Sequence, residues 1–334
     1  MRRWAVTAAF ALMLALPGIG PARALDHIKI NYVEPAPYYA PLFLAIDKGY
    51  FADLGIEAEL VQAGGGVATP ALISGDLDFS TSGSVAISAI LKNAKLRVLF
   101  VTSDRPAFEV WAQPAIKALD DLKGQQVGII SRGDTSEIAF RYYLSNHKLP
   151  GDFVAYTPLG TGTGRVAGIA SGTYSAALLG VNEMEELKAS GKFDRLHLLA
   201  DLTKDVHMVF SGLAARDATI AEKPDLVRRV LRGILEGMAH TKASRADAIA
   251  AMVAHGAGDA KKAAAQYDSS VGLLDSTGTT SLQNETIELQ LRGELLSVPR
   301  DQVKKSTEVF DFSFVEKAAA ELKAENWQPK TRGN

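Results

Sequence analysis

Cysteine is absent from this chain of 334 residues. Its absence excludes a disulfide framework, a thiolate metal site, a cysteine nucleophile and a lipid attached to an N-terminal cysteine. A large charge of one sign is also absent, because the formal net charge is only -2. Nucleic acid is therefore not an expected partner, since binding phosphates requires a concentrated basic face.

Long apolar runs are missing after residue 24, so no later segment is expected to cross a membrane. Within residues 1–24, Arg2 and Arg3 precede an apolar stretch from Trp4 to Leu16, and Ala22-Arg23-Ala24 forms a small-x-small site. This is the pattern of a cleavable secretory signal peptide. The apolar stretch is shorter than the roughly 20 residues that a membrane anchor needs. We therefore expect export.

Motifs for catalysis are scarce as well. The glycines at 160–164 have the wrong spacing for a dinucleotide loop, and no Walker lysine follows a glycine loop. The six histidines are scattered, with no pair at the helical spacing of metal ligands, and there is no Gly-x-Ser-x-Gly elbow. We therefore expect no catalytic residue, no metal and no cofactor, and interpret the chain as a non-enzyme.

An internal repeat is the main positive feature of the sequence. Residues 72–83 (LISGDLDFSTSG) return at 169–180 as IASGTYSAALLG, and glycine clusters precede both copies at 64–66 and 160–164. Each copy predicts a helix that ends at a glycine and is followed by a strand. The alternative is that glycine simply ends many helices before a strand. The length of the similarity favours two related lobes.

Strands alternate with helices along most of the chain, as in a doubly wound α/β sheet. The first helix is predicted at 40–51, and the tail predicts helices at 224–241, 248–254, 260–267 and 315–325. We divide the chain into a signal peptide (1–24), the first part of lobe I (25–111), lobe II (112–207) and a segment that completes lobe I and adds C-terminal helices (208–334). Two crossings between lobes predict a hinge, and the cleft between them is the expected ligand site.

Five motifs occur in the order expected of one known family: KINY at 29–32, PLFLAIDKGYF at 41–51, LGIE at 54–57, ISGDLDF at 73–79 and LKGQQVGI at 122–129. With them the chain resembles the substrate-binding proteins of ABC importers for sulfonates, taurine, nitrate and thiamine-precursor pyrimidines. The resemblance covers about residues 28–215. It implies a type II periplasmic binding protein fold, whose two lobes close on a small molecule and then dock on a membrane permease.

Ligand contacts are expected in the loops that follow strands and lead into helices, where free N–H groups favour anions. Arg132 and Arg165 could hold a carboxylate or sulfonate with two parallel hydrogen bonds, or could be solvated surface residues. Tyr38 and Tyr39 could clamp an aromatic body or pack in the core. The predicted ligand-binding residues are Tyr38, Tyr39, Gly65, Ser82, Ser84, Arg132, Asp134, Thr135, Thr161, Thr163, Arg165 and Asn182. Phe108 and Trp111 are further aromatic candidates, and Glu183 would repel an anion.

Together these patterns predict a monomeric solute-binding protein of the periplasm. It is expected to capture a small organic anion, such as a sulfonate or an aromatic carboxylate, and to deliver it to an ABC permease in the inner membrane. A neutral heterocycle such as a thiamine-precursor pyrimidine is the alternative ligand. A sensing module that presents its closed lobes to a membrane receptor is the alternative function.

Overall fold

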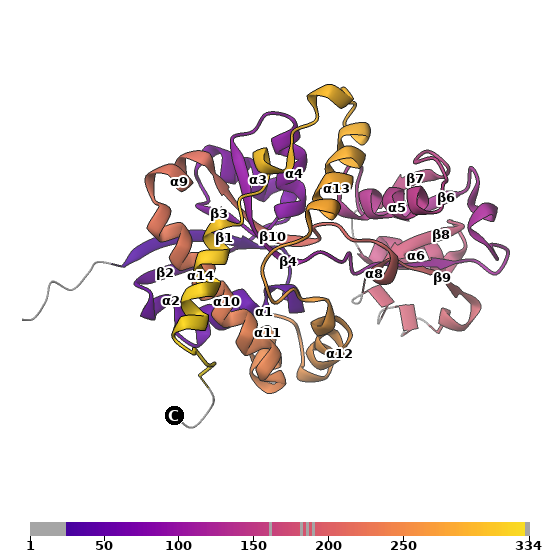
Figure 1. Cartoon of the computed structure of the whole chain (residues 1–334). Helices are drawn as coiled ribbons and strands as arrows, with labels where there is room; N and C mark the ends of the chain where they lie inside the picture. The colour runs from indigo at the N-terminus through magenta and orange to yellow at the C-terminus, as the bar shows by residue number, and fades with distance from the viewer. Residues whose placement is uncertain (1–24, 160–161, 181–182, 185–186, 189–190, 331–334) are drawn as a thin grey trace, which may run out of the picture.

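The protein is described by a computed structural model that covers residues 25–159, 162–180, 183–184, 187–188 and 191–330. The predicted signal peptide therefore lies outside the described residues. Figure 1 shows two lobes side by side, with the chain passing from the first into the second and back. Each lobe is built on a five-stranded sheet, with helices packed on it. The predicted α/β fold with two lobes is confirmed.

The sheet of lobe I has the strand order β2-β1-β3-β10-β4. β1 pairs in parallel with β2 and β3, whereas β10 runs antiparallel to both β3 and β4. β10 belongs to the segment that returns from lobe II, so this return completes the first sheet. The strands are β1 Asp26–Tyr32, β2 Ile56–Gln62, β3 Phe79–Ser80, β4 Leu96–Ser103 and β10 Ser211–Arg216.

Helices cover both faces of this sheet. The apolar stripe of α10 packs with α1 and α14 in one core, and α3 and α4 form a second core with β4 and β10. The stripe repeats every three or four residues, as a helix with one buried face requires. These helices are α1 Ala40–Asp47, α3 Gly65–Ser74, α4 Gly83–Leu91, α10 Pro224–Ala243 and α14 Ser313–Ala324.

Lobe II repeats the arrangement, with the strand order β7-β6-β8-β5-β9. Again the fourth strand, β5, is antiparallel to its neighbours and is supplied by the segment that enters from the other lobe. The strands are β5 Glu109–Ala112, β6 Gln126–Ile129, β7 Ala155–Pro158, β8 Ala176–Leu179 and β9 His197–Asp201, and the helices are α5 Thr135–Asn146, α6 Gly162–Ser171 and α8 Leu202–Asp205.

The sequence repeat corresponds to α3–β3 in lobe I and α6–β8 in lobe II. Gly75 and Gly172 end the two helices with φ of +96° and +80°, a conformation that side chains with a Cβ rarely adopt. β3 and β8 both occupy the centre of their sheets. The two copies are therefore equivalent units of two lobes with the same topology.

Three sequence expectations need correction. The division at residue 111 is too late, because β5 hydrogen-bonds within the second sheet, so the crossing lies at about residues 104–108. The helix predicted at 40–51 is two helices, α1 and α2 Tyr50–Asp53, because Gly49 between them has a φ of +73°. In the tail, α11 Arg245–Ala254 and α12 Ala260–Ser270 were predicted, but α9 Asp217–Glu222 and α13 Leu282–Leu295 were not.

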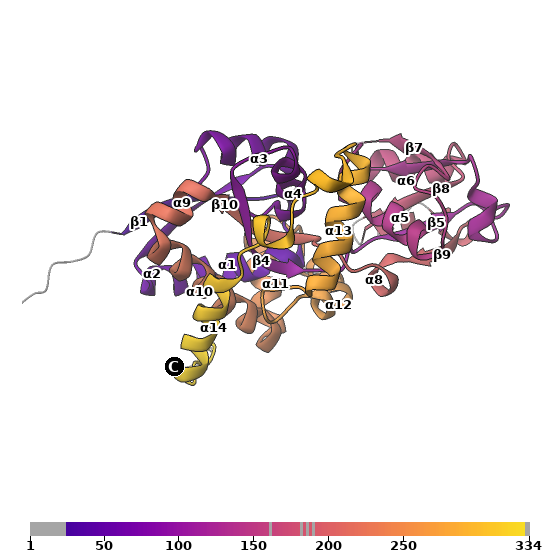
Figure 2. The same ribbon diagram turned by 45° about the horizontal axis from the view of Figure 1, so that its top comes forward.

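Figures 1 and 2 both show α13 between the two lobes, beside α4 of lobe I and α5 of lobe II. Its Leu289 joins a lobe I core, whereas Ile287, Leu291 and Leu295 pack on the core of lobe II. The C-terminal helices therefore do more than complete lobe I. None of the helices in the described part of the chain combines the length and the apolar character needed to span a membrane.

Candidate ligand-binding site

A cavity of about 390 Å³ lies between the lobes, within the range typical of small-molecule sites. The loops that follow β1, β3, β6 and β8 all reach it, because the carboxyl ends of parallel strands meet at one edge of each sheet. The two crossing segments close its base with Ala107, Phe108, Phe210 and Ser211. We call this cavity the cleft.

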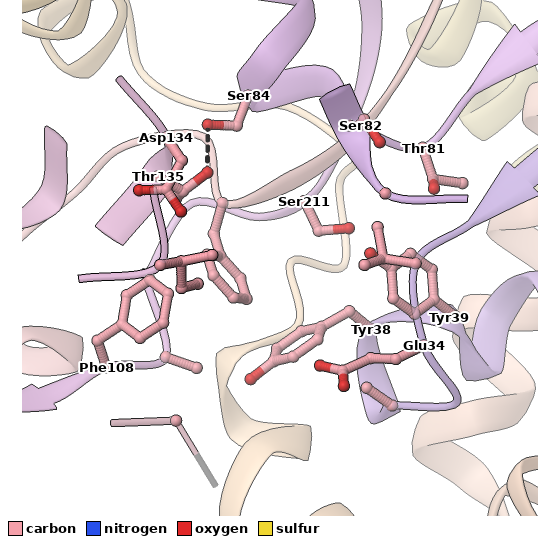
Figure 3. Close-up of a pocket in the computed structure, with 18 of the residues that line it drawn as sticks. Glu34, Tyr38, Tyr39, Thr81, Ser82, Ser84, Phe108, Asp134, Thr135 and Ser211 are labelled. Carbon is pink, nitrogen blue, oxygen red and sulfur yellow. Dashed lines mark hydrogen bonds between the residues drawn. The ribbon is translucent and has the colours of Figure 1, made fainter. Parts of the chain in front are cut away.

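Aromatic rings form the apolar walls of the cleft. Tyr38 and Phe108 both pack edge-on against Phe210, with ring centroids 4.9 Å and 5.5 Å apart. Tyr39 completes this set on the side of β1 (Figure 3). Burial raises the pKa of Tyr38 and of Tyr39 well above the usual tyrosine value, so both phenols stay protonated. Such walls suit a flat ligand held between ring edges and faces.

Hydroxyl groups supply most of the polar lining. Figure 3 shows Thr81, Ser82, Ser84, Thr135 and Ser211 around the cavity. Ser84 lies at the start of α4 in lobe I and Thr135 at the start of α5 in lobe II, and their hydroxyl oxygens are 2.9 Å apart. This hydrogen bond joins the two lobes directly across the cleft.

Asn31, at the end of β1, fixes the hydroxyl-bearing loops of lobe I. Its fully buried amide donates to the carbonyl of Ala63 at 2.9 Å and to Ser82 Oγ at 3.3 Å. Its side-chain oxygen accepts from Thr81 N at 3.1 Å, and its carbonyl accepts from Thr81 Oγ1 at 2.8 Å. One side chain thus ties the loops after β2 and β3 to β1. Gly65 lines the cleft beside them, where a Cβ would lie 2.5 Å from Val85 Cγ2.

Negative charge exceeds positive charge around the cleft. Of the described residues that line it, Glu34, Asp134 and Glu183 are acidic and Arg165 alone is basic. The Arg165 side chain is only 2% exposed and pairs with Glu183, and its Nε donates to the carbonyl of Leu178 at 3.1 Å. Glu183 also accepts from Gly180 N at 3.0 Å. The one guanidinium of the lining is therefore neutralised by the protein.

The Asp134 side chain accepts hydrogen bonds from residues of α5. Its Oδ1 accepts from Ser136 N, Glu137 N and Ser136 Oγ, which caps the N-terminus of α5. Burial raises the pKa of Asp134 despite these hydrogen bonds. No group of three potential metal ligands occurs among the described residues.

The structure brings together eight of the predicted site residues around the cleft: Tyr38, Tyr39, Gly65, Ser82, Ser84, Asp134, Thr135 and Arg165. Two predicted residues lie elsewhere. The prediction for Arg132 is corrected, because this residue does not line the cleft. Its side chain is 59% exposed and donates to the carbonyl of Tyr156 at 2.6 Å, beside Glu137. Thr163 is a second correction, because it is exposed on the first turn of α6. Thr161 and Asn182 lie outside the described residues.

Several lining residues were not predicted from the sequence. Phe210 and Ser211 follow the return crossing, which the sequence marks only as a strand. Gln266 and Ser270 come from α12, whose polar pattern is that of any surface helix. Phe108 lines the cleft as suggested, whereas Trp111 packs against Phe193 inside lobe II, with ring centroids 4.8 Å apart.

Comparison with known proteins gives a family and several relatives. A family model described as NMT1/THI5 like matches residues 36–248. The riboflavin-binding protein RibY of Chloroflexus aurantiacus is 26% identical over 238 residues, which is 68% of this chain and 65% of RibY. The chain thus matches just under two thirds of the length of that relative.

Solved structures share the fold. The periplasmic aliphatic sulphonate binding protein SsuA of Escherichia coli has a TM-score of 0.70 at 18% identity, covering 93% of this chain and 95% of SsuA. The desulfurization enzyme DszB has a TM-score of 0.61 at 14% identity, covering 89% of this chain and 99% of DszB. Both binding proteins and an enzyme therefore use this architecture, so the fold alone does not assign a function.

Proposed function

The chain belongs to the NMT1/THI5-like family, and from this premise we propose that it is the solute-binding component of an ABC importer. It takes a flat heteroaromatic ligand without negative charge into the cleft between its lobes. The aromatic walls and the excess of carboxylates around the cavity carry this proposal.

The proposed ligand differs from the organic anion that the sequence favoured. That expectation depended on helix N-termini together with Arg132 and Arg165. Neither arginine offers a free guanidinium fork to the cleft, and Asp134 caps the N-terminus of α5. An anion would approach Glu34, Asp134 and Glu183 at the cost of repulsion. A neutral heterocycle, the alternative from the sequence, can stack on the tyrosines and accept hydrogen bonds from the hydroxyls. The name of RibY adds support, since riboflavin is itself a flat heterocycle.

Binding rather than catalysis is the second part of the proposal. The relatives by sequence are named as binding proteins, and one acidic residue of the lining, Asp134, is engaged in capping α5. We propose that the mature protein acts as a monomer in the periplasm, after export by its signal peptide and without a lipid anchor. The closed form then delivers the ligand to a permease in the inner membrane.

A pair of ligands that differ in one charge tests the proposal. Nicotinamide is neutral and nicotinate is its anionic counterpart, and both are titrated calorimetrically into the mature protein with riboflavin and an alkanesulfonate alongside. We expect the neutral member of the pair to bind more tightly and to raise Tm. A ligand at a hundred times its Kd adds about 2.7 kcal/mol to the unfolding free energy. Tighter binding of nicotinate or of the sulfonate would overturn the ligand class.

Glu183→Gln serves as a charge variant for the same titration. Loss of its carboxylate leaves the buried Arg165 without its main counter-charge, so affinity for nicotinate should rise while affinity for nicotinamide changes little. Glu222→Gln is the matched control, because Glu222 is exposed at the end of α9. An equal effect of both variants on nicotinate would contradict the role given to the lining charge.

A further inference from the structure

Helix α13 connects the lobes a third time, in addition to the two crossing segments. Its Leu289 is buried in a lobe I core and its Leu291 packs on the core of lobe II. Its N-terminal end reaches the first crossing, where Asn284 Nδ2 donates to Asp104 Oδ2 at 3.3 Å. Motion of one lobe against the other must therefore be accommodated at α13 (Figure 2).

A buried ion pair lies on the inner face of α13. Glu288 and Arg292 are one turn apart, and each side chain is only 1% exposed. Arg292 Nε and Nη2 both donate to Glu288 Oε1, at 2.9 Å and 2.7 Å. The other oxygen, Glu288 Oε2, accepts from Val209 N at 2.9 Å. Val209 belongs to the return crossing and directly precedes Phe210 and Ser211 of the cleft.

The same arginine also reaches α4 of lobe I. Nη2 donates to Ser84 Oγ at 2.6 Å, and Nη1 donates to Ser88 Oγ at 3.0 Å. Because an arginine can only donate, Ser84 must accept from it, and the Ser84 proton is left for Thr135. The result is a continuous set of hydrogen bonds from Val209 through Glu288, Arg292 and Ser84 to Thr135 in lobe II.

Burying two charges is costly, and apolar residues of similar size could fill the same space at least as well. Unlike apolar residues, however, the pair can form a hydrogen bond of fixed direction. Through Arg292 it holds the Ser84 hydroxyl at the contact between the lobes. Arg292 does not line the cleft, so it acts on the ligand site through Ser84.

We propose that Arg292 is a positioning residue that fixes the bond between Ser84 and Thr135 and, with Glu288, couples closure of the lobes to the return crossing at Val209. The inference deepens the proposed function, because it concerns the same cleft. Removing Arg292 frees Ser84 and weakens the closed arrangement of the lobes, whatever ligand the protein carries.

Distances between the lobes test this proposal without any ligand. The chain has no cysteine, so Lys92→Cys in lobe I and Asp152→Cys in lobe II, both exposed, give two unique sites for spin labels. We expect a narrow distance distribution in the labelled parent and a broader, longer one in Arg292→Met. Ser84→Ala should give the same broadening, and the double variant no more than either single one, since both changes remove one interaction.

Two further variants keep the test decisive. The combined variant Glu288→Gln/Arg292→Met removes both charges. It is used in place of the single variant Arg292→Met if the unpaired Glu288 prevents that protein from folding. Arg292→Lys keeps the charge but lacks the fork that reaches Glu288, Ser84 and Ser88 together, so an intermediate distribution is expected. Arg300→Met is the control, because Arg300 is 90% exposed and pairs only with Glu294 among the described residues.

A folded Arg292→Met protein with the parental distribution would overturn the positioning role. So would a double variant that is broader than both single ones. Neither outcome bears on the proposed ligand class, because no ligand is present, and a failed ligand titration leaves these distances unaffected.

Discussion

Ser211 lies where the chain re-enters lobe I, and its side chain is buried at the base of the cleft. Its hydroxyl faces the cavity in Figure 3 and has no hydrogen-bond partner among the residues that the structure describes. A buried hydroxyl without a partner costs free energy, so a ligand that bonds to it recovers that cost. Ser211 therefore keeps a hydrogen-bonding capacity that no described residue uses and that a ligand could use.

Ser211→Ala is expected to lower affinity for the bound heterocycle while leaving stability unchanged or slightly increased. A neutral hydrogen bond contributes about 1 kcal/mol, or roughly a fivefold change in Kd. Calorimetry gives the affinity and urea denaturation gives the stability. Ser145→Ala, on the exposed face of α5, is the matched control. An unchanged Kd in Ser211→Ala would show that the ligand does not contact this hydroxyl.

At the same scale, the sequence could predict which loops form the site but not how each side chain is used. Tyr38, Ser84 and Thr135 each follow a predicted strand and lie at or before the start of the helix predicted after it, which marks their loops as candidates. Arg165 lines the cleft as expected, yet it forms an ion pair with Glu183, which follows β8, a contact that no local sequence pattern reveals. Arg132 differs for a similar reason, because the neighbouring β7 offers the carbonyl of Tyr156.

Among the elements, α1, α10 and α11 meet at a buried carboxylate. Asp247 accepts from Lys48 Nζ at 2.8 Å, from Ser244 Oγ at 2.8 Å and from His240 Nε2 at 2.9 Å. Tyr50 Oη lies 2.6 Å from His240 Nδ1 on the other side of the ring. These donors hold the pKa of Asp247 well below its usual range, with Lys48 the largest contributor.

Asp247→Asn should destabilise the protein at neutral pH by roughly 2 kcal/mol, since hydrogen bonds to a charged acceptor are lost. The native pKa is lowered, so this stabilisation is complete above the unfolded value near 3.9 and is lost as pH falls below it. The difference between parent and variant should therefore shrink below pH 4, as measured by urea denaturation at each pH.

Asp268→Asn is the control for this prediction. Asp268 pairs with Arg245, but both side chains are more than half exposed, so its replacement should have a much smaller effect. A difference for Asp247→Asn that stays constant down to pH 3 would contradict the proposed ionic role of the carboxylate.

The elements also show where prediction from sequence fails. Helices with one apolar face, such as α10 and α14, were predicted because they cover one side of a sheet. α13 was missed because it packs against both lobes and buries Glu285, Glu288 and Arg292, so its apolar residues do not form a single stripe. The apolar residues of α13 lie on two faces because the helix contacts both lobes, and this same distribution made it hard to predict from the sequence.

Across the whole molecule, the first strand after each crossing joins the sheet of the lobe that the chain enters. This strand is β5 in lobe II and β10 in lobe I. β5 and β10 take the same antiparallel place in the two sheets, and the crossings before them run side by side. Met208 N donates to Asp104 O at 2.7 Å, and Phe210 N donates to Ser103 O at 2.9 Å. The two crossings are thus hydrogen-bonded side by side, which is where we expect the hinge, and the bond between Ser84 and Thr135 is a further contact between the lobes.

A disulfide at that contact should lock the cleft. The Ser84 and Thr135 hydroxyls are 2.9 Å apart, and a chain without cysteine allows only the intended pairing in Ser84→Cys with Thr135→Cys. The bridge closes a loop of about fifty residues, which corresponds to about 4 kcal/mol of stabilisation by loop-closure entropy. Because the bridge prevents separation of the lobes at this contact, oxidation should raise the urea midpoint and slow hydrogen exchange in the cleft loops at 33–39 and 130–135.

Reduction of the same protein is the internal control, because it restores two free thiols without any change of sequence. The reduced protein should exchange the cleft loops as fast as either single cysteine variant does. If the oxidised and reduced forms exchange these loops at equal rates, the lobes do not separate at this contact. The cleft would then have to admit its ligand by movement of single loops, because a hinge that cannot open cannot gate the cavity.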